Sequence, residues 1–306
     1  MRAAVSDKRP KGVLGLGWAC LESAASGRTE HRPTSADYPD SVVKRIGFSA
    51  GGGLGWRISA LTSPRSDPPP WKIVVITGSP SWAEYWAPAL AALSPEREML
   101  VVDRPGFACS EPFDCVPDIR VQARALMPAT ALRPGQRLLL VGQSYGAAIA
   151  ALMAEQVRRR PGGLVLLSSY LGEPGPTARW LVGAGERVRS FIPRDLRNAV
   201  QEINGQPAQL PLMRQALAAL DAPIHMIHGS ADDFAPLHVA SRLSQEVRSR
   251  SPVRLVTAPG AGHFLNDGPT QALLDLLESC LPAPRPRRTW SWPRLRLVST
   301  RVALQS

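Results

Sequence analysis

Two serines lie in short sequences that could turn a hydroxyl group into a nucleophile. The stretch Gly47–Gly51, centred on Ser49, and the stretch Gly142–Gly146, centred on Ser144, both fit the pattern Gly-x-Ser-x-Gly. A serine hydroxyl attacks an acyl carbon only when it stands exposed, touches a base and lies beside backbone N–H groups that stabilise an oxyanion. At most one of the two serines is expected to meet these conditions.

The sequence around Ser144 meets them better than the sequence around Ser49. The segment "RLLLVG", which predicts a buried strand, precedes Ser144, and the helical pattern "AAIAALMAEQVRRR" follows it. A sharp strand-to-helix turn exposes the serine and places the positive end of a helix beside it. Four glycines lie within residues 50–55, directly after Ser49, and they oppose helix formation there. The first pattern therefore predicts a glycine-rich hairpin turn, and the second predicts the nucleophile.

A base and a carboxylate follow Ser144 at the ends of two later predicted strands. His263 lies in the glycine-flanked loop after "VRLVTA", and Asp232 lies just past the strand "PIHMIHG". His263 would take the Ser144 proton and return it to the leaving group, while the carboxylate would orient the imidazole. Asp233 is adjacent, and the sequence only favours Asp232.

Stabilisation of an oxyanion requires two donors in addition to these side chains. The backbone N–H of Tyr145, directly after the nucleophile, is one candidate. The N–H of Ser79 is the other, because Gly78 and Pro80 shape a tight turn after the strand "WKIVVI".

The elements that must position these residues alternate regularly along the chain. From residue 71 onward, short apolar runs typical of buried strands alternate with helical patterns, which indicates an α/β fold with a doubly wound, mostly parallel sheet. About fifty residues after the sixth strand contain helical patterns only, which predicts a small helical lid over the carboxyl ends of the strands. The expected organisation is an irregular extension at 1–40, a core at 41–169 and 222–281, a cap at 170–221, and a basic tail at 282–306.

Several motifs resemble those of the α/β-hydrolase fold superfamily. Their order and spacing along the chain agree over about 240 residues between Val42 and Cys280. "VGQSYG" is similar to its nucleophile elbow, "TGSPS" to its oxyanion loop, and "VVDRPGFACS" to its segment after the second buried strand; "GSADDFAP" and "GAGHF" resemble its acid and histidine loops. Thr77 stands where the superfamily usually has histidine, and Ala108 replaces a glycine. The resemblance implies a serine hydrolase of the esterase or lipase type, and it implies no particular substrate.

Composition limits the other functions. The formal net charge is +11, and residues 281–306 contribute six arginines and no acid. This tail is either a solvated arm or a peripheral membrane contact. The charge is local, so no nucleic-acid partner is expected. The chain has four scattered cysteines, which fit free thiols in the cytoplasm better than disulfides.

Other sequence signals point away from membrane-spanning segments, metals and cofactors. No apolar run is long enough for a membrane span, and residues 12–26 make a poor signal peptide. His225 and His228 are spaced so that they would face opposite sides of a strand, which disfavours a metal site. No metal or cofactor is expected.

Three functions remain open. The first is hydrolysis of a carboxylic ester, thioester or related small acyl substrate through an acyl-enzyme on Ser144. The second uses the same three side chains for carbon–carbon bond hydrolysis or cofactor-free perhydrolysis. The third is a non-catalytic, hydrolase-like binding protein that associates with a membrane through its basic tail.

Overall fold

The core is an eight-stranded sheet in the order β1-β2-β4-β3-β5-β6-β7-β8. The computed structural model describes residues 34–157, 161–247 and 249–281. The strands are β1 (Lys44–Ser49), β2 (Arg57–Thr62), β3 (Trp71–Ile76), β4 (Arg97–Val102), β5 (Arg137–Gln143), β6 (Gly163–Leu167), β7 (Ile224–Gly229) and β8 (Val253–Ala258). From β4 to β8 all neighbours pair in parallel, whereas β2 pairs antiparallel with both β1 and β4.

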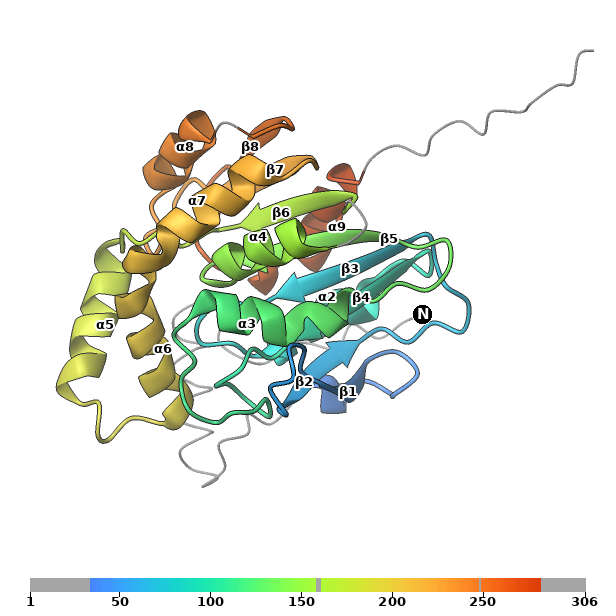
Figure 1. Ribbon diagram of the computed structural model, residues 1–306, viewed down its shortest axis with the longest axis horizontal. Coiled ribbons are helices and arrows are strands. Elements are labelled where there is room, and N and C mark those ends of the chain that lie inside the picture. Colours follow the sequence, from blue (N-terminus) through green and yellow to red (C-terminus); the bar gives the residue numbers. More distant parts are fainter. Residues whose placement is uncertain (1–33, 158–160, 248, 282–306) are drawn as a thin grey trace, which may run out of the picture.

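The central strands are apolar on both faces because helices cover both sides of the sheet. Every residue of β3 and β6 is buried. Helices α3 (Ile119–Leu126), α4 (Gly146–Gln156) and α8 (Leu237–Glu246) pack on one face, and α2 (Ala87–Ala92) and α9 (Thr270–Ser279) pack on the other. Short 3₁₀ turns complete the fold at Thr34–Asp37, Ala83–Trp86, Met127–Thr130, Gln206–Gln209 and Leu265–Asp267. The layers are visible in Figure 1. The predicted α/β class and mostly parallel sheet are confirmed.

The glycine-rich stretch after Ser49 is a hairpin turn, as the sequence indicated. Ser49 is the last residue of β1, pairs with Arg57 of β2 and is exposed to solvent. Gly52, Gly53 and Gly55 all adopt positive φ angles, which side chains with a Cβ disfavour. No helix follows Ser49, so it lacks the setting of a nucleophile.

Three helices lie between the sixth and seventh strands. They are α5 (Pro176–Arg187), α6 (Arg194–Gly205) and α7 (Leu210–Ala219). Met213, Ala216 and Leu217 of α7 pack with α4 in the main core on one face of the sheet. Helices α5 and α6, here called the cap helices, extend beyond the sheet instead (Figure 1). Only the first two helices of the insertion therefore stand over the carboxyl ends of the strands.

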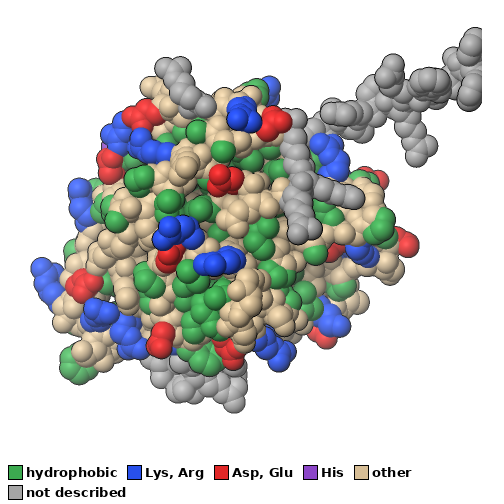
Figure 2. Space-filling view, in the orientation of Figure 1, with side chains coloured by type: hydrophobic (Ala, Val, Ile, Leu, Met, Phe, Trp, Pro, Cys, Tyr) green, Lys and Arg blue, Asp and Glu red, His purple; other side chains and the backbone are tan. Residues whose placement is uncertain are grey.

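Charges on the outer surface are mixed. On the face shown in Figure 2, Lys and Arg side chains are interspersed with Asp and Glu side chains and form no large patch of one sign. In the described part of the chain, no helix is both long and apolar enough to cross a bilayer.

Candidate active site

Ser144 occupies a sharp turn between β5 and α4. Its φ angle is +50°, a left-handed conformation that costs energy in any residue with a Cβ. The turn forms because the flanking glycines let strand and helix approach. A Cβ on Gly142 would collide with Ala147 and Ala150, and one on Gly146 would collide with the Ile76 and Thr77 carbonyls. The strain and the two glycines together project the Ser144 hydroxyl above the end of the sheet.

The structure brings Ser144, His263 and Asp232 into one hydrogen-bonded chain. His263 Nε2 lies 3.0 Å from Ser144 Oγ, and His263 Nδ1 lies 2.9 Å from Asp232 Oδ2. All three residues are 7% exposed. Residues from the ends of β5, β7 and β8 converge because parallel strands end at the same edge of the sheet.

Asp232 is held as a carboxylate by donors on both of its oxygens. Oδ1 accepts the backbone N–H groups of Phe234 and Ala235, and Oδ2 faces both His263 and His228 Nε2, the latter at 3.2 Å. Burial alone would raise the pKa of Asp232, but the hydrogen bonds from His228, His263 and Ala235 lower it below its usual range. Asp233 instead accepts a hydrogen bond from Thr177 on the surface.

The imidazole is fixed by packing as well as by hydrogen bonds. Phe234 stacks on the His263 ring with 5.1 Å between centroids, and Phe264 meets the same ring edge-on. Behind the nucleophile, Gln143 donates to Asn266 in the histidine loop at 2.6 Å and accepts from Trp86 at 2.9 Å. These contacts leave the His263 ring little freedom to rotate away from Ser144.

The residues of the two expected oxyanion donors, Tyr145 and Ser79, lie near Ser144. Tyr145 follows Ser144 and precedes the first residue of α4. Ser79 belongs to the loop after β3, and a Cβ on the preceding Gly78 would come within 3.1 Å of Ser144 Cβ. The loop therefore lies in contact with the nucleophile. Thr77, which replaces the usual histidine, donates its hydroxyl to the Val102 carbonyl at 3.0 Å and also pairs with Ser81.

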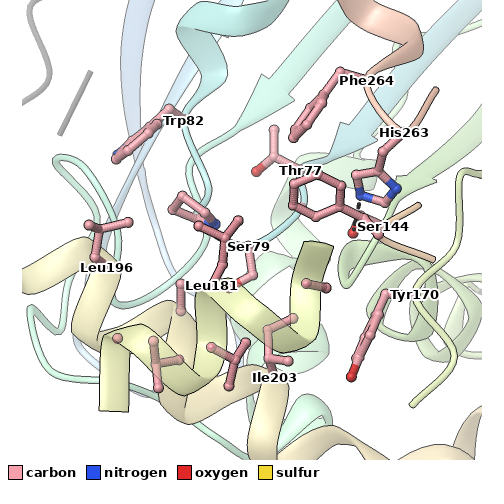
Figure 3. A pocket seen from close by; sticks show the side chains of 18 of the residues that line it. Thr77, Ser79, Trp82, Ser144, Tyr170, Leu181, Leu196, Ile203, His263 and Phe264 are labelled. Carbon is pink, nitrogen blue, oxygen red and sulfur yellow. Dashed lines mark hydrogen bonds between the residues drawn. The ribbon is translucent and has the colours of Figure 1, made fainter. Parts of the chain in front are cut away.

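A cavity of about 400 Å³ opens beside Ser144 and His263. The cap helices form one wall with Leu181, Val188, Ala199, Val200 and Ile203, among others, and the core supplies Trp82, Tyr170 and Phe264. Figure 3 shows Leu181, Leu196 and Ile203 across the cavity from the nucleophile. Burial raises the pKa of Tyr170 to about 12, so its phenol stays neutral. This size suits a small or medium ligand.

The sequence analysis did not identify four side chains that lie near the site. His228 was considered only as a metal ligand, yet it lies against Asp232. Gln143 and Asn266 tie the elbow to the histidine loop. Arg104 lies against the loop after β3, where its Nη2 donates to the Gly78 carbonyl at 2.7 Å. The only sequence feature that pointed to Arg104 was its position in the motif "VVDRPGFACS".

Other groups considered from the sequence lie elsewhere. Among the described residues, Cys109, Cys115 and Cys280 form no disulfide bond. Burial raises the pKa of Cys115 to about 12 and that of Cys280 to about 11, which makes neither a ready nucleophile. Within the described ranges, no three His, Cys, Asp or Glu side chains gather as a metal site. Residues 1–33 of the extension predicted at 1–40, and the tail at 282–306, fall outside the described residues.

Comparison with known proteins agrees with the fold. A family model described as the alpha/beta hydrolase family matches residues 73–276. A search of curated proteins gave no significant match. Among solved structures, a thermophilic esterase from Thermogutta terrifontis is 19% identical with a TM-score of 0.57, covering 78% of this chain and 99% of that chain.

Two further structures show how broad the similarity is. A bacterial membrane phospholipase A is 17% identical with a TM-score of 0.59, covering 87% of this chain and 97% of that one. A 2-hydroxy-6-oxo-6-phenylhexa-2,4-dienoate hydrolase from Rhodococcus sp. strain RHA1 is 19% identical with a TM-score of 0.57, covering 78% and 99%. At such identities the likeness concerns the fold alone.

A doubly wound sheet with a serine at a strand-to-helix turn, next to a histidine, defines a hydrolase architecture. The match over residues 73–276 shows that the chain belongs to the alpha/beta hydrolase family.

Proposed function

We propose that the protein is a serine hydrolase that cleaves an uncharged, largely apolar carboxylic ester or thioester. The observation that carries the proposal is the chain from Ser144 through His263 to Asp232, with heavy-atom distances of 3.0 Å and 2.9 Å. These distances are within hydrogen-bond reach for proton transfer.

The reaction follows from these contacts. Ser144 Oγ attacks the acyl carbon while His263 Nε2 takes its proton, and the carbonyl oxygen becomes an oxyanion beside the Ser79 and Tyr145 N–H groups. Collapse breaks the bond to the leaving group, which receives the proton from His263. A water molecule then attacks the acyl-enzyme, gives a proton to His263 and releases the acid, and the proton returns to Ser144.

The lining of the cavity favours a neutral substrate. Aliphatic and aromatic side chains dominate it, and the described residues that line it include Asp267 but no Lys or Arg. The Rhodococcus hydrolase is named for a dienoate, which carries a carboxylate. A carboxylate substrate would meet no cationic side chain among the lining residues described here, so the ester is favoured over that carbon–carbon substrate.

An active-site probe tests the proposal directly. A fluorophosphonate should label the wild-type protein, and Ser144→Ala should remove the label. Ser49→Ala is the matched control, since it changes the other Gly-x-Ser-x-Gly serine and should label normally. Undiminished labelling of Ser144→Ala would rule out the assignment. Hydrolysis of a series of p-nitrophenyl esters, from acetate to laurate, then defines the acyl preference.

A further inference from the structure

Arg104 follows β4 and lies completely buried under the loop that carries Ser79. Its guanidinium donates to the Thr77 carbonyl at 2.9 Å and to the Gly78 carbonyl at 2.7 Å. The two Nη atoms of Arg104 form a bidentate ion pair with the Glu202 carboxylate, at 2.7 Å and 2.8 Å. Gln122 accepts the remaining hydrogen at 2.7 Å. All of the donors of Arg104 are thus used inside the protein.

The contact with Gly78 determines where the Ser79 N–H points. The Gly78 carbonyl and the Ser79 N–H belong to one planar trans peptide group, so they point in opposite directions. Arg104 is fully buried and is not among the residues that line the cavity, so it draws the carbonyl into the protein interior and leaves the N–H on the cavity side, near Ser144. Rotation of this peptide would remove the donor from the oxyanion.

Arg104 also touches the residue that presents the second donor. Its Cζ lies 4.8 Å from the ring centroid of Tyr145 and 4.8 Å from that of Phe107, so the guanidinium lies against both aromatic rings. One buried cation therefore contacts both Gly78 and Tyr145, the residues that set the direction of the two N–H groups.

Glu202 comes from the cap helix α6 and binds the same loop directly. Its Oε2 accepts the Ser79 hydroxyl at 2.6 Å, and its Oε1 accepts the Gln122 amide at 2.7 Å. Asp195 and Asn198 lie on the same face of α6 and bind Trp82 and the Gly106 carbonyl. The buried face of α6 is therefore polar and fixed at three points, whereas Leu196, Ala199 and Ile203 line the cavity.

We propose that the Arg104–Glu202 ion pair is the positioning element of the oxyanion hole, so that α6 is a fixed part of the catalytic centre. This inference rests on the proposed function. A buried ion pair adds little stability over an apolar pair of similar volume, because both charges must be desolvated. A role in orienting the peptide explains its presence better than a contribution to folding.

The test compares turnover with stability in two variants. Arg104→Met/Glu202→Leu removes both charges together and leaves no buried charge unpaired. Arg104→Lys keeps a charge opposite Glu202 but cannot hold the carbonyls and the carboxylate at once. With p-nitrophenyl butyrate we expect kcat to fall about 10²-fold in the double variant, a loss typical of a misplaced donor, while KM changes little. Arg104→Lys should lose less, in the same direction.

A second readout separates positioning from folding. A trifluoromethyl ketone forms a tetrahedral adduct with Ser144 whose oxyanion lies in the hole, so its inhibition constant should rise by the factor by which kcat/KM falls. Turnover is expressed per serine titrated with fluorophosphonate, which removes unfolded protein from the comparison.

A second ion pair away from the site serves as the control, and the outcomes distinguish failure of this inference from failure of the proposed function. Arg133→Met/Glu98→Gln removes an ion pair of 2.8 Å at the amino-terminal end of β4, opposite the end that leads to Arg104, and should leave kcat unchanged. Wild-type-like kcat and inhibition in the Arg104 variants would overturn the inference. If the larger changes prevent folding, Ser79→Ala removes only the direct link to Glu202 and must still lower kcat. If the wild type neither reacts with fluorophosphonate nor cleaves any ester, the proposed function fails instead.

Discussion

Replacement of Asp232 by asparagine tests the arrangement around His263 most sharply. Asp232 Oδ1 accepts two backbone N–H groups, from Phe234 at 3.0 Å and Ala235 at 2.8 Å. An asparagine must present its amide oxygen to these donors, because its NH₂ group would repel them. The NH₂ then faces the Nδ1 atom of His263.

The consequence is a change of tautomer. An NH₂ group facing Nδ1 requires an unprotonated Nδ1, which places the proton on Nε2 beside the Ser144 hydroxyl. Such an imidazole cannot accept the serine proton. Loss of the correct tautomer lowers kcat by about 10⁴ in serine hydrolases of this type, or about 5 kcal/mol of barrier. The pocket shape and KM should change little.

The assay is single-turnover and steady-state cleavage of p-nitrophenyl butyrate by Asp232→Asn, with Asp233→Asn as the matched control. Asp233 binds Thr177 outside the site, so its variant should stay near wild-type activity. An Asp232→Asn enzyme that keeps more than about a tenth of wild-type kcat would refute the tautomer argument.

Three further predictions concern pH, the cavity and the tail. The pKa of Asp232 lies below its usual range, so its stabilising effect is complete above the unfolded-state pKa of about 3.9 and is lost as the pH falls further. The free energy of unfolding, measured with urea, should therefore fall more steeply with decreasing pH below about pH 4 in the wild type than in Asp232→Asn. Equal slopes of the unfolding free energy against pH would contradict this. Leu181→Trp narrows the cavity and should shift the ester preference toward shorter acyl chains, measured as kcat/KM over the ester series. If kcat/KM depends on chain length as in the wild type, the acyl group does not bind beside Leu181. Removal of residues 282–306 should abolish flotation with anionic vesicles, and equal flotation of both forms would exclude the tail as a membrane contact.

Local patterns in the sequence were sufficient to predict the fold and the setting of the nucleophile. The strand before Ser144 contains the apolar run 138–141 and the helix after it is rich in alanine, so both elements can be predicted from short windows. The same windows assigned Ser49 to a hairpin, and its neighbours Gly52, Gly53 and Gly55 do have positive φ angles. Order along the chain then placed Asp232 and His263 at the ends of later strands.

Contacts between distant segments could not be predicted in this way. Arg104 and Glu202 are 98 residues apart, and no local pattern links them. Asp195, Asn198 and Glu202 share one face of α6, and a polar helix face is ordinarily the solvent face. In this protein that face is buried on the core, and the apolar face borders the cavity.

His228 illustrates a different limit. The sequence shows a histidine near the end of β7, and residues three apart on a strand face opposite sides, which made a metal pair with His225 improbable. That argument says nothing about residues beyond the strand. The chain turns back after Gly229, so the Ala235 carbonyl comes within 2.6 Å of His228 Nε2 and Asp232 Oδ2 within 3.2 Å. The partner is set by the loop, whose course the strand pattern does not determine.

The polar face of α6 bears on how substrate reaches Ser144. A lid that opens must break its contacts with the core, and α6 would have to expose Asp195, Asn198 and Glu202 together with their buried partners. Breaking a buried ion pair costs several kcal/mol, whereas α5 meets the cavity with apolar side chains such as Leu181 and Val188. Val188, the residue directly after α5, is also exposed, so we expect movement of α5 alone to open the cavity at far lower cost. Hydrogen exchange should therefore be fast in α5 and slow in α6, and the opposite order would contradict a fixed α6.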